Sequence, residues 1–377
     1  MNKNNKLIEV ATVFFRLGCI AFGGPAAHIA MMEDEIVQKR KWMNRQHFLD
    51  LIGATNLIPG PNSTEMVMHC GHERAGVPGL FVAGVCFVFP AVVITGILAW
   101  FYTSYGQLPE VTPFIFGIKP AVLAIIASAI MKLGKKALKS WEIGVIGVLV
   151  LITSLLGINE ITALLSGGLL GTVYFYSKSR LITTTPKSIA PFFLFNISTA
   201  TLMKLSSLKV FWTFIKVGAI LYGSGYVLFA YLDAELVTKG WLTRPELIDA
   251  IAVGQFTPGP VLSTATFIGY QLAGFWGAVA ATIGIFLPSF LFVLLLNPLV
   301  PKMRTSKVLS YFLDSVNIAA VGIMLSVLYV MSLDTLTDWK SIMIALLSVV
   351  IIFGIKKVNA MWVVLGGSIL GYLLALI

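Results

Sequence analysis

IPGPNST (residues 58–64) and TPGPVLST (residues 257–264) carry one motif twice, in two otherwise apolar regions of the chain. Proline has no backbone N–H and pushes the residue before it out of the helical region, so a continuous helix must stop at each motif. Because proline is tolerated in the first turn of a helix, Pro61 and Pro260 are expected to start new helices. The motif therefore predicts two helix breaks, each with free amide N–H groups and a positive helix-dipole end facing the gap.

The composition places these breaks in a membrane. Of the 377 residues, 57% are hydrophobic and 12% are charged, with a mean hydropathy of +0.89, whereas about a quarter of the residues of a soluble protein are charged. A helix needs about 20 apolar residues to cross a bilayer, and no β-barrel alternation is visible. The apolar runs are residues 79–101, 113–131, 143–158, 161–176, 279–296, 308–331, 342–355 and 361–377, and runs that begin near Leu7 and Phe211 each contain a cation.

The second half of the chain repeats the first at a shift of about 200 residues. We therefore divide the chain into an N-terminal repeat (1–177), a more polar linker (178–207) and a C-terminal repeat (208–377). Matches outside the motif include Gly18 with Gly218, Glu35 with Glu235, Trp42 with Trp241, Asp50 with Asp249, Gly76 with Gly274 and Pro90 with Pro288.

The loop charges predict that the two repeats have opposite orientations. TSYGQLPEVTP (103–113) contains no Lys or Arg, whereas its counterpart PLVPKMRTSK (298–307) contains three. The next pair reverses this bias, with four lysines in KLGKKALK (132–139) against one in SLDTLTDWK (332–340). Because Lys and Arg mark cytoplasmic loops, we predict an all-α polytopic membrane protein of two homologous halves with inverted topology, as in many secondary transporters. About 10–12 membrane segments are expected, since each crossing takes about 20 residues.

One feature of the topology is left open by the charges. The N-terminus and the loop around Arg40 both have cytoplasmic charge, which requires residues 7–32 to dip into the membrane and return, with a break at FGGP (22–25). If residues 7–32 cross the membrane instead, the N-terminus lies outside.

The breaks are candidate anion sites, because a helix N-terminus flanked by hydroxyl groups binds anions. Cations add to this, since Arg16 and Lys216 occupy matched positions in apolar runs, where an unpaired charge is costly. The alternatives are a plain kink for the motif and, for the two cations, snorkelling to the interface. The expected substrate-binding residues are Arg16, Gly23, Gly24, Pro59, Gly60, Pro61, Asn62, Ser63 and Thr64 in the first repeat, and Lys216, Gly223, Thr257, Pro258, Gly259, Pro260, Ser263 and Thr264 in the second. Lys119 and its counterpart Asn317 are a further pair of candidate lining groups.

Glu65 distinguishes the first break from the second, which has no carboxylate. Asn62 to Glu65 fits a capping box, in which the acidic side chain would satisfy amides at its own helix start. Alternatively, Glu65 carries protons for coupling, together with His69 or His72, because histidine titrates near neutral pH. A further alternative is that these histidines face the cytoplasmic interface beside Arg74. In each case the second break keeps its positive potential and is the better candidate for holding an anion.

Several stretches resemble the chromate ion transporter family: the paired PGP motifs, the FGG at residues 22–24, TPGPVLSTATFIGY (257–270) and IFLPSF (285–290). The resemblance covers nearly the whole chain and implies two homologous halves of opposed orientation and export of chromate from the cytoplasm. The first repeat departs from the family pattern, because Asn62 and Glu65 stand where many members have apolar residues. That departure leaves the identity of the oxyanion open.

The expected function is that of a secondary transporter which exports chromate or a related tetrahedral oxyanion across the cytoplasmic membrane, driven by an ion gradient or the membrane potential. The alternatives are a carrier of sulfate or another anion, and an anion channel. No nucleotide-binding motif, metal-ligand cluster or catalytic constellation is present in the sequence, so we expect no enzyme activity, cofactor or metal. Beyond substrate and lipid, homodimerisation is left open, and nucleic acid is not expected because the net charge of +10 is spread over short loops.

Overall fold

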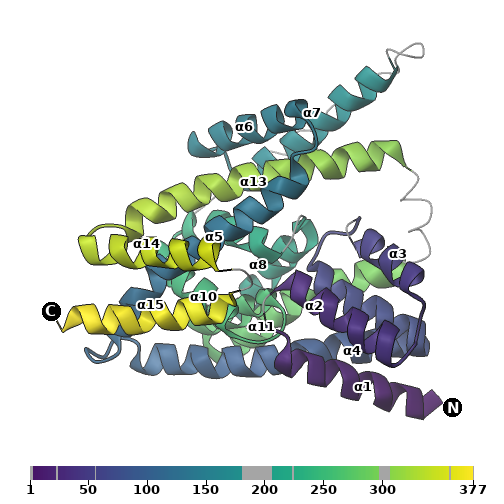
Figure 1. Cartoon of the computed structure of the whole chain (residues 1–377), viewed down its shortest axis with the longest axis horizontal. Coiled ribbons are helices and arrows are strands. Elements are labelled where there is room, and N and C mark those ends of the chain that lie inside the picture. The colour runs from purple at the N-terminus through teal and green to yellow at the C-terminus, as the bar shows by residue number, and fades with distance from the viewer. Residues whose placement is uncertain are drawn as a thin grey trace.

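The computed structural model describes residues 3–22, 24–55, 57–180, 206–222, 225–296, 306–355 and 358–376 (Figure 1). Most of the predicted linker, residues 181–205, lies outside the described residues. The first repeat contains α1 (Lys3–Ile20), α2 (Pro25–Met32), η1 (Glu33–Lys39), α3 (Arg45–Thr55), α4 (Asn62–Tyr105), α5 (Thr112–Ala137), α6 (Trp141–Leu155) and α7 (Glu160–Arg180). The second contains α8 (Ser207–Ile220), η2 (Gly225–Val227), α9 (Leu228–Leu232), η3 (Asp233–Val237), α10 (Arg244–Phe256), η4 (Val261–Ser263), α11 (Thr264–Leu296), α13 (Lys307–Thr335), α14 (Trp339–Gly354) and α15 (Ala360–Ala375).

Helices α4 and α11 are each a tight hairpin of two arms. The backbone leaves the helical region at Ala75 and Gly76, and again at the matched Ala273 and Gly274. A continuous helix would separate Gly71 from Gly79 by about 12 Å along its axis, yet a side chain at Gly71 would overlap the Gly79 backbone. The chain therefore reverses direction at 75–76 and at 273–274, and we call residues 62–74 and 264–272 the short arms and residues 77–105 and 275–296 the long arms.

The first PGP motif lies at the tip of a hairpin that enters and leaves by the same face. Helix α3 ends at Thr55 and α4 begins at Asn62. His47 Nε2, in the first turn of α3, lies 3.1 Å from Glu73 Oε2, near the end of the short arm. The two helices therefore run antiparallel, with the motif between them.

Helix α1 and the segment α2–η1 form a second hairpin from that same face. Arg16 pairs with Glu35 at 2.6 Å in the middle of this hairpin, and Glu9 pairs with Arg40 at 3.0 Å at its open end. The chain thus dips in and returns between Ile20 and Pro25, as one of the two alternatives requires. In the second repeat Lys216 pairs with Glu235 at 2.6 Å in the same way.

The two repeats enter from opposite faces. The long arm of α4 starts beside Arg74, which donates to Glu9 at 2.6 Å, and ends near Tyr102, whose hydroxyl donates to Asp249 at 2.7 Å. Residues 77 to 102 span about 38 Å of helix, so Asp249 lies far from Asp50, its match in α3. We call the two sides the Arg40 face and the Arg244 face. The predicted fold, an all-α membrane protein of two inverted halves, is confirmed.

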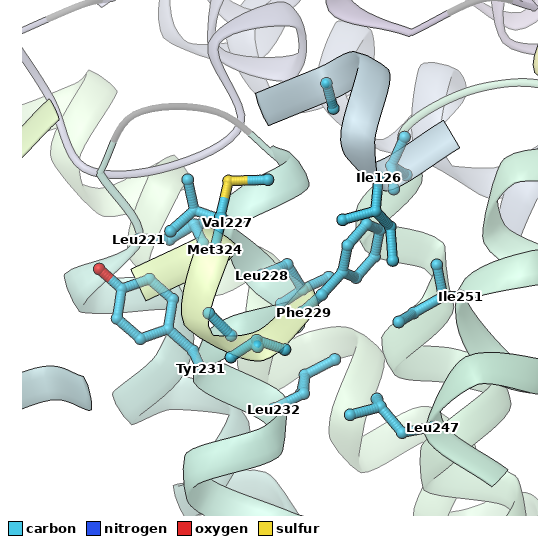
Figure 2. Close-up of a cluster of buried hydrophobic side chains, with 14 of the residues drawn as sticks. Ile126, Leu221, Val227, Leu228, Phe229, Tyr231, Leu232, Leu247, Ile251 and Met324 are labelled. Carbon is cyan, nitrogen blue, oxygen red and sulfur yellow. The ribbon is translucent and has the colours of Figure 1, made fainter. Parts of the chain in front are cut away.

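The described residues include long apolar helices and one short helix that is buried on all sides. Among these residues, four helical segments contain an apolar stretch long enough to span a bilayer: Asn62–Tyr105, Thr112–Ala137, Val261–Leu295 and Lys307–Thr335. The short α9 is instead buried on all sides, because each of its five residues is at most 2% exposed. It packs among Ile126, Leu247, Ile251 and Met324 (Figure 2). Through this core, the first hairpin of the second repeat packs against α5, α10 and α13.

Candidate functional site

The two helix breaks interlock at the centre of the molecule. The N–H of Gly60 donates to the carbonyl oxygen of Leu221 at 2.7 Å, and the N–H of Gly259 donates to that of Ala21 at 2.8 Å. Each bond therefore joins the break of one repeat to the end of the first helix of the other, at matched positions. Both glycines have positive φ, 146° and 89°, a backbone conformation that other residues avoid.

The surroundings of the two central glycines differ in polarity. Gly60 packs against Glu65 Oε1 and Ser289 Oγ, and a side chain at this position would overlap both. Gly259 packs against Ala91, which is the match of Ser289 in the other long arm. The central glycine of the first break thus has a carboxyl and a hydroxyl group beside it, and the central glycine of the second break has a methyl group.

Hydroxyl groups gather at the second break. Thr95 Oγ1, from the long arm of α4, donates to Ser263 Oγ at 3.2 Å. Thr264 Oγ1 donates to the carbonyl oxygen of Val261 at 2.8 Å, and Thr257 Oγ1 donates to that of Gly254 at 3.3 Å. All four side chains are at most 5% exposed, and Pro258 and Pro260 bracket Gly259 beside them.

At the first break, His28 links Ser63 to Ala21, the residue that accepts from the second break. Its Nε2 lies 3.0 Å from the carbonyl oxygen of Ala21, and its Nδ1 lies 3.3 Å from Ser63 Oγ. A carbonyl oxygen only accepts, so Nε2 carries a proton, and in the neutral ring Nδ1 accepts from Ser63. Because Ala21 also accepts from Gly259, a hydrogen-bonded chain runs from the first break through His28 to the second.

Glu65 does not form the predicted capping box. Pro61 (φ −80°, ψ 96°) takes the cap position, and no side chain caps the helix start at Asn62. The Glu65 carboxyl turns back toward Gly60, is 0% exposed, and has no hydrogen-bond partner among the described residues. The prediction was wrong because Pro59 and Pro61 fix a backbone that directs this side chain into the break. His69, one turn later, is 1% exposed.

The two matched cations, Arg16 and Lys216, are paired with carboxylates. Their side chains are 55% and 42% exposed, whereas Glu35 and Glu235 are 7% and 2% exposed. Both glutamates lie in π-helical segments, η1 and η3, a wide helix form that is frequent at functional sites. Glu35 also accepts from Arg40, whose pKa is raised mainly by that hydrogen bond. The cations therefore lie part-way along each hairpin, four residues before its first helix ends at Ile20 or Ile220.

Some of the remaining predicted site residues are described by the structure, and others are not. Gly24 precedes α2 with φ 80°, and Thr64 Oγ1 is buried without a partner among the described residues. Gly23 and Gly223 lie outside the described residues. The sequence reasoning missed His28, Thr95 and Ser289, although each is a single polar residue in an apolar region, and that pattern is the signal that finds them.

Comparison with known proteins gives the same assignment for both halves of the chain. The family model described as Chromate transporter matches residues 8–172 and again residues 208–372. A chromate transport protein of Cupriavidus metallidurans is 30% identical over 97% of this chain and 92% of its own length. A probable chromate transport protein of Synechococcus elongatus is 31% identical over 91% of this chain and 89% of its own length. No solved structure matches the chain significantly. The chain belongs to the chromate transporter family.

Proposed function

We propose that the protein is a secondary transporter that exports chromate, or a related tetrahedral oxyanion, across the cytoplasmic membrane. The observation that carries this proposal is the pair of interlocked breaks, Gly60 to Leu221 and Gly259 to Ala21. Backbone that is not helical survives at membrane depth only inside protein or along a water-filled path. Two such breaks, joined across inverted repeats, provide a substrate site between two parts that can move relative to each other.

The second break is the proposed oxyanion site. The hydroxyl groups of Ser263 and Thr264 lie where a helix begins, and their printed partners among the described residues are a hydroxyl and a carbonyl oxygen, not a carboxylate. In this conformation Ser263 Oγ accepts from Thr95, and Thr264 Oγ1 donates to the carbonyl oxygen of Val261. An oxyanion would take over as the acceptor from Thr95 and Thr264. Chromate and sulfate are both tetrahedral dianions, and either suits such donors. Arg16 and Lys216, each on a helix whose end meets a break through Ala21 or Leu221, would attract the anion toward the breaks.

The first break is the proposed coupling site. Glu65 is buried beside Gly60, and Gly60 is bonded to the second repeat through Leu221. An ionisable group at membrane depth without a partner is costly unless it has a function. Loss or gain of a proton on Glu65 changes the charge beside the bond that joins the two repeats. A proton gradient is therefore the proposed driving force, with His69 as a second titrating group on the same helix.

The charge distribution supports a cytoplasmic Arg40 face. This face carries Arg40, Lys41 and Arg45 before the first break, and α5 returns to it with Lys135 and Lys136 in its last turn. The loop at the end of α4, residues 106–111, contains no cation and lies at the opposite face. Export then runs from the Arg40 face to the Arg244 face.

The test is transport by the purified protein in proteoliposomes. Chromate, sulfate, molybdate and phosphate are offered separately, with and without an imposed proton gradient. We expect saturable chromate uptake that depends on the gradient, weaker uptake of sulfate or molybdate, and none of phosphate. An unsaturable conductance would favour the anion channel, preferred uptake of sulfate would favour a sulfate carrier, and no uptake of any oxyanion would refute the proposal.

A further inference from the structure

A buried polar cluster lies away from both breaks, between α4, α5 and α10. The Tyr102 hydroxyl donates to Asp249 Oδ2 at 2.7 Å, and Lys119 Nζ lies 3.5 Å from the same oxygen. The other carboxylate oxygen, Asp249 Oδ1, is buried and has no hydrogen-bond partner among the described residues. The side chain of Asp249 is 5% exposed and that of Lys119 is 25% exposed.

The position of this cluster relates it to the substrate path. Asp249 is on α10 and lies eight residues before Thr257, the residue that follows this helix. Eight residues correspond to about 12 Å along a helix. It lies five residues after Arg244, which pairs with Asp233 at 3.1 Å and with Asp334 at 3.3 Å. The cluster therefore stands between the second break and the Arg244 face.

The cluster has the chemistry of an anion-binding site, and the anion that occupies it is a carboxylate of the protein itself, Asp249. A carboxylate presents charged oxygens to an ammonium group and a phenol, as an oxyanion would. Buried polar atoms are nearly always hydrogen-bonded, whereas the contacts of Asp249 with Tyr102 and Lys119 use Oδ2 and leave Oδ1 without a partner among the described residues. The matched positions differ in chemistry, because Asn317 stands where Lys119 has its match and Asp50, the match of Asp249, accepts from Gln46 at 3.3 Å.

Few other charges act on Asp249. Glu246, on the same helix, bonds to Thr243 at the helix start. Helices α11 and α15 contain no Asp, Glu, Lys, Arg or His.

The carboxylates of η3 are paired, Asp233 with Arg244 and Glu235 with Lys216 and Lys239. On α13, Asp334 pairs with Arg244, Asp314 pairs with Lys139, and Lys307 lies at the opposite end of the helix. Lys119 is thus the main counter-charge of Asp249.

We propose that Lys119 and Tyr102 form a second oxyanion site, on the path between the second break and the Arg244 face, and that Asp249 is its built-in competitor. When Asp249 is ionised it occupies Lys119 and Tyr102 and excludes a dianion. When Asp249 takes up a proton from the aqueous phase, its charge is lost and the ammonium and phenol groups become available to the oxyanion. The inference goes beyond the proposed function and rests on it for the identity of the transported ion.

Sulfate binding to the purified full-length protein tests this site, because sulfate remains a dianion from mildly acidic to mildly alkaline pH. Affinity is measured by isothermal titration and by the sulfate-dependent rise in melting temperature. Four proteins are compared: wild type, Asp249→Asn, Lys119→Met and, as the matched control in the other repeat, Asp50→Asn.

We expect wild type and Asp50→Asn to bind sulfate more tightly at acidic than at alkaline pH. Asp249→Asn should lose this dependence and, at alkaline pH, bind at least about tenfold more tightly than wild type, because the competitor no longer occupies the site. Without sulfate, Asp249→Asn should melt at a lower temperature, since Lys119 lacks its counter-ion, and sulfate should restore the loss. Lys119→Met should bind sulfate with an affinity that does not change with pH, unlike wild type.

Weaker or unchanged sulfate binding by Asp249→Asn would overturn the proposal, and so would wild-type pH dependence in Lys119→Met. If Asp249→Asn cannot be recovered from membranes, the comparison of wild type with Lys119→Met decides alone. Chromate transport by wild-type proteoliposomes is measured in parallel. If that transport is present while the sulfate results are negative, the second site fails and the proposed function stands.

Discussion

Arg16 and Lys216 each pair with a glutamate nineteen residues further along the chain. At the scale of single residues, matched positions keep their geometry, as Gly60 and Gly259 also do. The neighbouring positions differ in chemistry, because Ser289 and Glu65 surround the first glycine and Ala91 lies beside the second. A duplicated backbone thus carries two different sites.

Lys216→Met separates the two roles that this cation can have. If Lys216 contacts the oxyanion, the variant should lose at least about tenfold in transport kcat/KM, which corresponds to one charge-assisted hydrogen bond. The double variant Lys216→Met with Glu235→Gln should then remain defective. Lys239→Met, which removes the other partner of Glu235, is the control and should transport normally. Recovery of transport in the double variant would mean that Lys216 only neutralises Glu235.

Single-residue roles were only partly predictable from the sequence. The hydroxyls at the breaks were found because they adjoin proline, whose effect on the backbone is local. The capping box was wrong because spacing alone cannot show that Pro61 takes the cap position. The cluster of Tyr102, Lys119 and Asp249 was not predicted as a unit, since its members come from different repeats and meet only after folding.

At the scale of elements, each repeat is built from hairpins that dip into the membrane from one face. The tight turns of α4 and α11 are at Gly76 and Gly274, with φ of 67° and 64°. The PGP breaks could be predicted from the sequence, because proline ends a helix in any context. These turns were not predicted. Gly274 lies in a run without charges, and Glu73 and Arg74 before Gly76 do not show that the helix reverses there. The path of α1 was left open because the loop charges fit more than one path.

Gly274→Ala should destabilise the protein by about 1–3 kcal/mol, because φ 64° with ψ −154° is almost restricted to glycine. Thermal unfolding in detergent measures the change. Gly366→Ala is the control, since Gly366 lies inside α15 with open space around it. That substitution should be neutral or slightly stabilising, because alanine favours helix more than glycine does. Equal melting temperatures for the two variants would contradict the assigned turn.

At the scale of the whole molecule, the two repeats have opposite orientations. The repeat and its inverted charge bias could be read from the sequence, and Tyr102 at the far end of α4 from Arg74 shows the inversion in space. The interlocking of the breaks could not be read, because no local pattern indicates which carbonyl oxygen each glycine N–H meets.

Matched exposed positions test the sidedness. Gln38 and Thr238 are both exposed and lie at the open ends of corresponding hairpins. In a protein whose Cys19, Cys70 and Cys86 are replaced, Gln38→Cys and Thr238→Cys are treated with a membrane-impermeant maleimide on whole cells. Thr238→Cys should react on intact cells, and Gln38→Cys only after permeabilisation. Reaction of both from the same side would contradict the inversion.

The two interlocked breaks have different proposed roles, with the oxyanion at the second and proton coupling at the first. The most direct measurement compares chromate exchange without a gradient and proton-driven chromate uptake, in proteoliposomes of Glu65→Gln and of Ser263→Ala with Thr264→Val. Glu65→Gln should keep exchange and lose gradient-driven uptake, and the hydroxyl variant should lose at least about tenfold of both activities. Loss of exchange in Glu65→Gln, or normal activity of both kinds in the hydroxyl variant, would contradict the account.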